Sequence, residues 1–195
     1  MKALLQFSAS DRLKKRLASL SGIEVAIVKE SDEESFRREI VDSDVFLHVL
    51  KPVTAEMIAM APKLKLIQKI GVGVNTIDLN AAREASVAVA NMPGTNTSAV
   101  AEHTLSMMLA TLRRIAEFDA ATRQGKGWQL SPNQTEALGE ISGSSVGLIG
   151  YGAVAEKLTL YLTALGAKVQ YWSRTIKPNA IASSVTFEKL LERSD

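Results

Sequence analysis

The stretch Ser144-Ser145-Val146-Gly147-Leu148-Ile149-Gly150-Tyr151-Gly152-Ala153-Val154-Ala155 decides the fold. Its apolar strand runs directly into the pattern Gly150-x-Gly152-x-x-Ala155, and a helical pattern follows until Gly166. Gly150 permits the tight turn out of the strand, Gly152 lets the backbone approach a pyrophosphate, and Ala155 lets helix and strand pack closely. The start of the helix offers free N–H groups and the positive end of its dipole to phosphates. The residues predicted to bind a dinucleotide here are Gly150, Gly152, Ala153, Val154 and Ala155.

Glycines with this spacing also occur in turns of unrelated α/β proteins and in folds that bind other adenosine cofactors. In this chain the strand before the glycines and the helix after them are both evident, and a second strand follows at 167–172. This context favours a nicotinamide dinucleotide site over those alternatives.

The tripeptide Ser173-Arg174-Thr175 follows that second strand, at a place where NAD enzymes usually carry Asp or Glu. A carboxylate would accept hydrogen bonds from a free 2′-hydroxyl and would repel a 2′-phosphate. Ser173 removes the repulsion, and Arg174 can pair with the phosphate through two hydrogen bonds. The sequence therefore favours NADP over NAD. The alternative is that Arg174 is a solvated loop cation and that the protein uses either cofactor.

Short apolar runs alternate with helical patterns in the first part of the chain. This alternation is typical of βαβ units around a parallel sheet, where ligands collect at the carboxyl ends of the strands. We therefore expect an α/β fold. The expected strands are 3–5, 24–28, 44–47, 65–67 and 87–89, and the expected helices include 11–20 and 33–41.

A longer helical pattern runs from Ser98 to about Thr122, with a broad apolar stripe and no Gly or Pro inside it. This length exceeds that of the average helix. Two interpretations stay open: a buried core helix, or a spine that joins two domains or two subunits.

The composition excludes several classes of protein. The 195 residues are 46% hydrophobic and 23% charged, which is ordinary for a globular chain, and the absence of cysteine excludes disulfides, thiolate zinc sites and cysteine nucleophiles. The net charge of +2 is too small to draw the whole molecule to nucleic acid or to an anionic membrane. No apolar run approaches the roughly 20 residues of a membrane helix. We expect a cytoplasmic protein with no nucleic-acid or membrane partner and no metal site.

Three blocks of sequence resemble the D-isomer-specific 2-hydroxyacid dehydrogenases. They are LKLIQKIGVGVNTID at 64–78, NMPGTNTSAVAEH at 91–103, and the glycine loop that begins at Gly147. The resemblance covers essentially the whole chain. It implies a flavodoxin-like substrate domain over residues 1–97, followed over residues 98–195 by the first half of a Rossmann dinucleotide-binding domain.

The resemblance also implies roles for residues outside the glycine loop. The backbone of Val72-Gly73-Val74 is expected to hold a substrate carboxylate, because N–H groups at a glycine turn can form an anion nest. Thr97 resembles the residue that approaches the nicotinamide, although Thr97 or Ser98 could equally cap a helix. His48 ends the third strand, and we expect it to be either a substrate-side contact or an ordinary loop residue.

By resemblance, the parent protein transfers a hydride between NADP, or NAD, and a small 2-oxoacid or 2-hydroxyacid such as glyoxylate or hydroxypyruvate. The family's catalytic His, Glu and Arg normally come later than Asp195. We therefore expect these 195 residues to be an inactive piece of a larger dehydrogenase, with no catalytic residue of their own. The alternative is a dinucleotide-sensing binding module or corepressor-like scaffold of the same fold. The resemblance further implies a homodimer, with the helix at 98–122 as a candidate surface.

Overall fold

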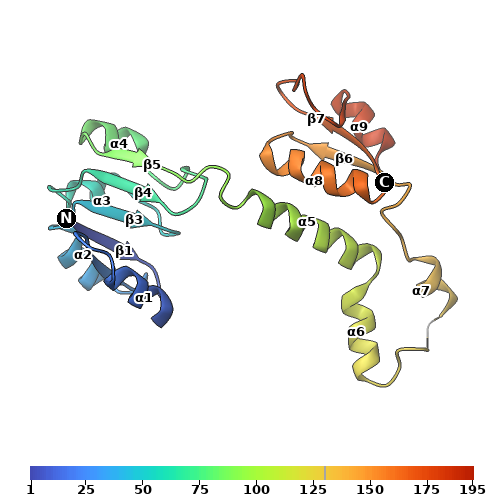
Figure 1. Ribbon diagram of the computed structural model, residues 1–195, viewed down its shortest axis with the longest axis horizontal. Helices are drawn as coiled ribbons and strands as arrows, with labels where there is room; N and C mark the ends of the chain where they lie inside the picture. Colours follow the sequence, from blue (N-terminus) through green and yellow to red (C-terminus); the bar gives the residue numbers. More distant parts are fainter. Residues whose placement is uncertain (130) are drawn as a thin grey trace. The chain divides into compact units, whose positions relative to one another are not determined.

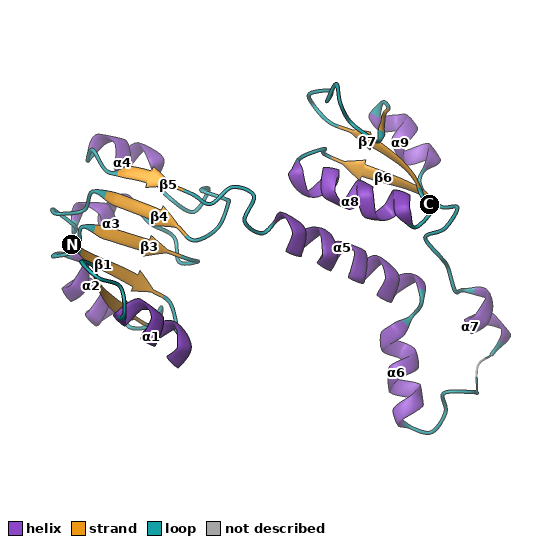
Figure 2. Ribbon diagram, in the orientation of Figure 1, coloured by secondary structure: helices purple, strands orange, loops and turns teal. Residues whose placement is uncertain are grey.

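The computed structural model describes residues 1–129 and 131–195, which form two compact units, Met1–Thr95 and Asn96–Asp195. Each unit has its own parallel sheet and its own hydrophobic core (Figures 1 and 2). Within the described ranges, no helix combines the length and the apolar character needed to cross a membrane.

The sheet of the first unit has five parallel strands in the order β2-β1-β3-β4-β5. This order is that of flavodoxin-like folds, so the predicted architecture of this unit is confirmed. All five predicted strands form, with small shifts at their ends. The elements are β1 (Lys2–Gln6), α1 (Asp11–Ala18), β2 (Glu24–Val28), α2 (Glu33–Ile40), β3 (Val45–His48), α3 (Ala55–Ala59), β4 (Leu66–Lys69), α4 (Leu79–Glu84) and β5 (Ala88–Ala90).

The helices of the first unit begin at side-chain caps. Each cap accepts a hydrogen bond from a backbone N–H three residues further on, which satisfies a group that the helix itself leaves unpaired. The caps of α1 to α4 are Ser10, Asp32, Thr54 and Asp78.

The main hydrophobic cluster of the first unit lies on one face of its sheet. Leu4, Phe46 and Ile67 occupy neighbouring positions on β1, β3 and β4, and each is almost completely buried. Phe36 of α2 packs edge-to-face on Phe46, with ring centroids 5.6 Å apart. Burial of side chains of this size contributes about 1.5–3 kcal/mol each. The row continues toward the carboxyl ends of the strands, where it becomes polar at His48 and Lys69.

The second unit contains a three-stranded parallel sheet in the order β6-β7-β8, with β6 at its edge. A strand, a glycine turn, a helix and a second parallel strand follow one another, as in the first half of a Rossmann fold, which confirms the predicted fold class. The elements are α5 (Thr97–Leu112), α6 (Ile115–Arg123), α7 (Pro132–Glu136), β6 (Ser145–Ile149), α8 (Ala153–Ala164), β7 (Lys168–Trp172), β8 (Ser183–Ser184) and α9 (Phe187–Arg193).

The single helix predicted over residues 98–122 is wrong, because the structure contains two helices there, α5 and α6 (Figure 1). The N–H of Gly139 bonds at 3.0 Å to the last carbonyl of α5, which a continuing helix would use. Arg114 then takes a left-handed φ of 50° and starts α6 in a new direction. The break depends on Gly139, which lies 27 positions beyond Leu112, so no residue near the break indicates it in the sequence.

Helix α9 packs closely on the edge strand β6 at Gly147. A Cβ added to Gly147 would lie 2.2 Å from Ser194 Oγ and 3.0 Å from Leu190 Cγ. The side chain of Ser194 is itself held by a 2.6 Å hydrogen bond to the carbonyl of Leu190. The approach of helix and strand is therefore as close as a glycine allows.

We expect Gly147→Ala to destabilise the second unit by about 1–3 kcal/mol, because the new methyl group overlaps α9. Urea unfolding of the variant and the parent chain measures the difference. The double variant Gly147→Ala with Ser194→Ala removes the nearest clashing atom and should recover part of the loss. Unchanged stability in Gly147→Ala would contradict the close packing of α9 on β6.

Candidate functional site

The turn between β6 and α8 leaves open space above its glycines. Gly150 has a φ of +93°, a conformation that side-chain-bearing residues rarely adopt, and its N–H bonds to the carbonyl of Trp172 at 2.8 Å. A Cβ added to Gly150 or to Gly152 would meet no atom within 4 Å. The absence of both side chains therefore creates a cradle beside exposed backbone.

Helix α8 begins directly at this turn, with Gly152 in the N-cap position. No side chain of the described residues caps it, and its first three residues are Ala153, Val154 and Ala155. The first intrahelical bond runs from the N–H of Glu156 to the carbonyl of Gly152 at 3.0 Å. The N–H groups before it remain available to an anion, and the 12-residue helix adds its dipole.

A groove of about 1060 Å³ lies at the carboxyl ends of β6 and β7. Trp172 and Phe187 meet edge-to-face in its wall, with ring centroids 5.2 Å apart. Ser173 and Arg174 line the groove. They therefore lie at the end of β7, where the residues that distinguish NADP from NAD were expected. Thr175 does not line it; its carbonyl accepts a 2.5 Å hydrogen bond from Ser173 Oγ.

The side chains of this groove carry more positive than negative charge. Its lining includes three cations, Arg174, Lys189 and Arg193, and one carboxylate, Glu188. Lys189 and Arg193 were not singled out by sequence, because they belong to α9 and only the folded chain brings that helix to the end of β7. Such a local excess of cations attracts a phosphate group even though the whole chain is nearly neutral.

In the first unit, the turn after β4 exposes backbone N–H groups. The carbonyls of Gly71 and Val72 accept hydrogen bonds from the N–H of Met92 and from Asn91 Nδ2, at 2.9 and 2.8 Å. The N–H groups of Val72-Gly73-Val74 bond to none of the described residues. At the predicted anion nest, the carbonyls are therefore hydrogen-bonded to Met92 and Asn91, and the backbone N–H groups are available to a ligand. Asn91 was missed by sequence reasoning, although it directly follows β5.

His48 lies beneath the loop after β3, not on its surface. Its side chain is 1% exposed, and its Nε2–H donates to the carbonyl of Lys51 at 2.8 Å. Burial, together with the nearby charge of Lys69, lowers the pKa of His48, whereas the bond to the Lys51 carbonyl acts in the opposite direction. Lys69 is also buried, and its Nζ donates to the carbonyl of Val49. These two side chains therefore hold the loop from below.

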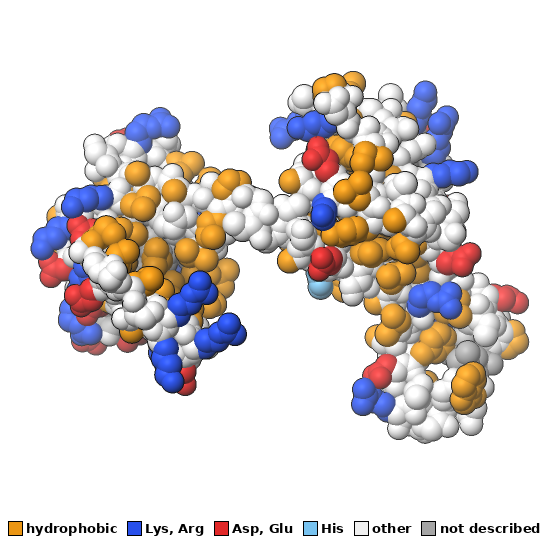
Figure 3. Space-filling model, viewed as in Figure 1, with side chains coloured by type: hydrophobic (Ala, Val, Ile, Leu, Met, Phe, Trp, Pro, Cys, Tyr) orange, Lys and Arg blue, Asp and Glu red, His pale blue; other side chains and the backbone are white. Residues whose placement is uncertain are grey.

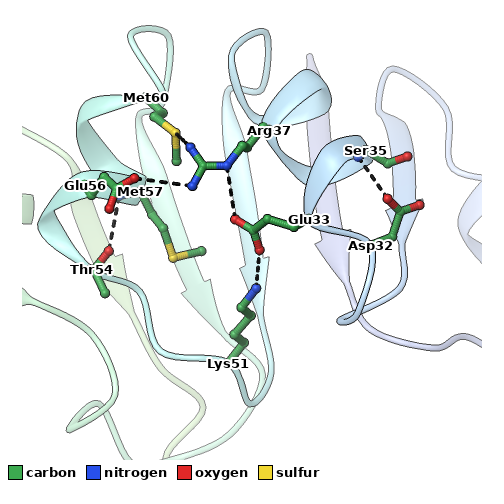
Figure 4. Close-up of polar contacts among 9 residues, drawn as sticks. All are labelled: Asp32, Glu33, Ser35, Arg37, Lys51, Thr54, Glu56, Met57 and Met60. Atoms are coloured by element: carbon green, nitrogen blue, oxygen red, sulfur yellow. Dashed lines mark hydrogen bonds and ion pairs between the residues drawn. The ribbon is translucent and has the colours of Figure 1, made fainter.

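An ion pair ties the same loop, residues 49–52, to α2, and a further pair ties α2 to α3 (Figure 4). Lys51 Nζ donates to the carboxylate of Glu33 on α2 and lowers its pKa. Arg37 lies between the helices, with Nε 3.4 Å from Glu33 and Nη2 3.3 Å from Glu56 on α3. Exposed pairs of this kind contribute at most about 1 kcal/mol each, so their effect is chiefly on the orientation of the loop.

Thr97 is the first residue of α5 and is half-buried. Asn96 holds the N-cap position without a side-chain bond, so neither Thr97 nor Ser98 is the cap. This finding removes the capping interpretation of Thr97.

The comparisons with known proteins agree with this geometry. The catalytic domain of the D-isomer specific 2-hydroxyacid dehydrogenases matches residues 4–190. The chain belongs to this family. One relative is a glyoxylate reductase of Thermococcus litoralis, which is 37% identical over 165 residues. The matched region covers 80% of this chain and 49% of the relative. A D-3-phosphoglycerate dehydrogenase of Mycobacterium leprae is 33% identical over 178 residues, or 89% of this chain and 33% of the relative.

Solved structures of similar fold extend the comparison. The TT0316 protein from Thermus thermophilus has a TM-score of 0.88 and 29% identity, and a NAD-dependent formate dehydrogenase from Staphylococcus aureus, solved in complex with NAD, has a TM-score of 0.84 and 26% identity. Each similarity covers all of this chain and 63% of the solved chain. Of the two relatives named before, the glyoxylate reductase and the D-3-phosphoglycerate dehydrogenase, the chain spans between a third and a half of the length.

The lowered pKa of His48 predicts a loss of stability in acid. The unfolded chain takes up a proton near the ordinary histidine pKa of 6.5, whereas the folded chain resists it to lower pH, so the free energy of unfolding falls as pH drops below about 6.5. We expect His48→Gln, which keeps a donor for the Lys51 carbonyl, to lose less stability than the parent chain between pH 7.5 and 5.5.

Urea unfolding at the two pH values measures this effect, which amounts to at most about 1.4 kcal/mol per pH unit. The matched control is His103→Gln, because that side chain is exposed on α5. An equal pH dependence in His48→Gln and the parent chain would refute the assignment to His48.

Proposed function

We propose that this chain forms the substrate-binding and nucleotide-binding parts of a nicotinamide-dependent oxidoreductase for small 2-oxoacids or 2-hydroxyacids. The observation that carries the proposal is the cradle at Gly150 and Gly152, which opens beside the uncapped start of α8. Residues 1–97 are the substrate domain in this proposal, and residues 98–195 belong to the nucleotide domain. Membership of the 2-hydroxyacid dehydrogenase family supports the same reaction class.

The residues present fit a dinucleotide. When bound, the nicotinamide supplies the hydride chemistry at its C4 atom. The N–H groups at Gly152, Ala153, Val154 and Ala155 bind the pyrophosphate, and the half-buried Thr97 approaches the nicotinamide. The proposal gives the residues of this chain binding and orienting roles, and it assigns no proton transfer to any of them.

We further propose a preference for NADP over NAD. A 2′-phosphate would enter the groove at the end of β7, where Ser173 offers no negative charge and Arg174 offers two donors in a plane. The surplus of positive charge in the groove supports this choice. Thr175 acts through its carbonyl, which orients Ser173.

The substrate end of the proposal rests on the anion nest at Val72-Gly73-Val74. Three N–H groups that bond to no described residue suit the carboxylate that every 2-oxoacid and 2-hydroxyacid carries. His48 takes part by holding the neighbouring loop, since its imidazole is too deeply buried to touch a substrate. The names of the relatives, glyoxylate reductase and D-3-phosphoglycerate dehydrogenase, support small acidic substrates.

A homodimer in the cytoplasm completes the proposal. Large hydrophobic side chains remain exposed along α5 and at the start of α6, and hydrophobic side chains gather on the surface of this unit (Figure 3). Val100, Met107 and Ile115 are 38%, 54% and 53% exposed. A patch of this kind suits contact with a second copy of the chain.

The cradle is tested by filling it. We expect Gly152→Ala to weaken NADPH binding and Gly152→Val to weaken it more, by tenfold or more, which corresponds to about 1.4 kcal/mol. Folding should be unaffected, because a Cβ added at this position meets nothing within 4 Å. The titration follows the fluorescence of Trp172 in a Trp128→Phe background, where it is the single tryptophan of the chain. Unaltered affinity in Gly152→Val, with folding intact, would exclude the cradle as the pyrophosphate site.

The cofactor preference is tested at Arg174. We expect Arg174→Gln to weaken NADPH binding by about tenfold, the effect of losing one charge-assisted contact, and to leave NADH binding nearly unchanged. Lys168→Gln is the matched control, because Lys168 is an exposed cation at the opposite end of β7. Calorimetric titration gives all the affinities. A parent chain that binds NADH as tightly as NADPH would refute the preference.

A further inference from the structure

Two buried tyrosines connect the glycine turn with the strand beside it. Tyr151, between Gly150 and Gly152, is 3% exposed, and Tyr171 of β7 is fully buried. Their rings are stacked, with centroids 4.1 Å apart and planes at 28°. The side chain of the turn residue therefore points into the protein and packs on the strand that leads to Arg174.

Both phenol groups bind the segment that follows β7. Tyr171 Oη accepts a hydrogen bond from the N–H of Lys177 at 3.0 Å, and Tyr151 Oη accepts one from the N–H of Ala182 at 3.4 Å. Residues 174–179 between the strand and these contacts are all exposed. The two hydroxyls thus anchor an otherwise solvated segment at two points.

Arg174 lies within the loop that the Tyr171 to Lys177 bond closes. An arginine can hold a phosphate with both of its terminal nitrogens only when its backbone is in a defined place, because ordering a mobile loop on binding costs free energy. Inside the loop, the hydrogen bond from Ser173 Oγ to the Thr175 carbonyl adds local order. The bond from Lys177 to Tyr171 links this local structure to the core.

We propose that Tyr151 and Tyr171 are a positioning pair that couples the pyrophosphate cradle to the loop that discriminates NADP from NAD. The inference rests on the proposed function, since it assumes a dinucleotide at these two places. Tyr171 sets the position of Arg174 through Lys177, and Tyr151 links that loop to the glycine turn through the ring stack and through Ala182. Neither phenol needs to touch the cofactor.

The test compares two ligands that differ only in the 2′-phosphate. In the full 195-residue chain, Tyr171→Phe keeps the ring stack and removes the hydroxyl. We expect its affinity for NADP⁺ to fall about fivefold, as for one hydrogen bond, and its affinity for NAD⁺ to change by less than about twofold. A merely structural role would reduce both affinities by the same factor, so calorimetric titration of both ligands separates the two explanations.

A second measurement needs no ligand. Amide hydrogen exchange in residues 174–182 should accelerate in Tyr171→Phe, because the segment has lost one of its two anchors. Tyr151→Phe should shift the NADP⁺ to NAD⁺ affinity ratio in the same direction and serves as the second variant if Tyr171→Phe does not fold. The matched control is Tyr161→Phe on α8, which should leave the affinity ratio unchanged. The ring of Tyr161 lies 5.7 Å from Lys157 Nζ.

The outcomes separate this inference from the proposed function. A parent chain that binds neither dinucleotide overturns the proposed function and the inference together. A parent chain that binds NADP⁺, with an affinity ratio that both tyrosine variants leave unaltered, overturns the inference alone. A lowered ratio with faster exchange at 174–182 supports it.

Discussion

The left-handed turn at Gly150 is the constraint on which the second unit depends. It takes the chain out of β6 and into α8 within three residues, and it does so at a φ that a side-chain-bearing residue would occupy only with strain. The absence of a side chain at Gly152 then keeps the backbone of the turn accessible. The fold therefore requires the glycine at position 150, whereas the glycine at position 152 keeps the turn open.

The first unit exposes donors by a related arrangement. At the turn after β4, the carbonyls of Gly71 and Val72 are engaged by Met92 and Asn91, while the neighbouring N–H groups bond to no described residue. In the loop after β3, His48 and Lys69 bind backbone carbonyls from below. In both places side chains or backbone groups of the protein bind carbonyls of a turn, and in the turn after β4 the N–H groups stay available. Backbone N–H groups arranged in this way can attract an anion without a charged side chain among them.

Local patterns predicted the parts of the fold that depend on local chemistry. Alternating apolar runs identified the strands of the first sheet, and the glycine spacing identified the junction of β6 and α8. The break at Arg114 escaped prediction because it depends on the distant contact with Gly139. The inward orientation of Tyr151 and the deep burial of His48 escaped it because the packing of neighbouring strands decides where a side chain points. The cations Lys189 and Arg193 escaped it because α9 reaches the groove only in the folded chain.

The open edge of β6 bears on protein engineering. At that edge, the carbonyl of Ser145 accepts a hydrogen bond from the N–H of Asp195 at 3.0 Å. The N–H of Ser145 donates to the carboxylate of Asp195 at 2.8 Å. A strand grafted at this edge would have to replace these two bonds before it could pair with Ser145. Pairing along this edge would therefore begin with the loss of contacts to Asp195. Position 147 of β6 would also have to stay a glycine in such a protein, because α9 leaves no room there for a side chain.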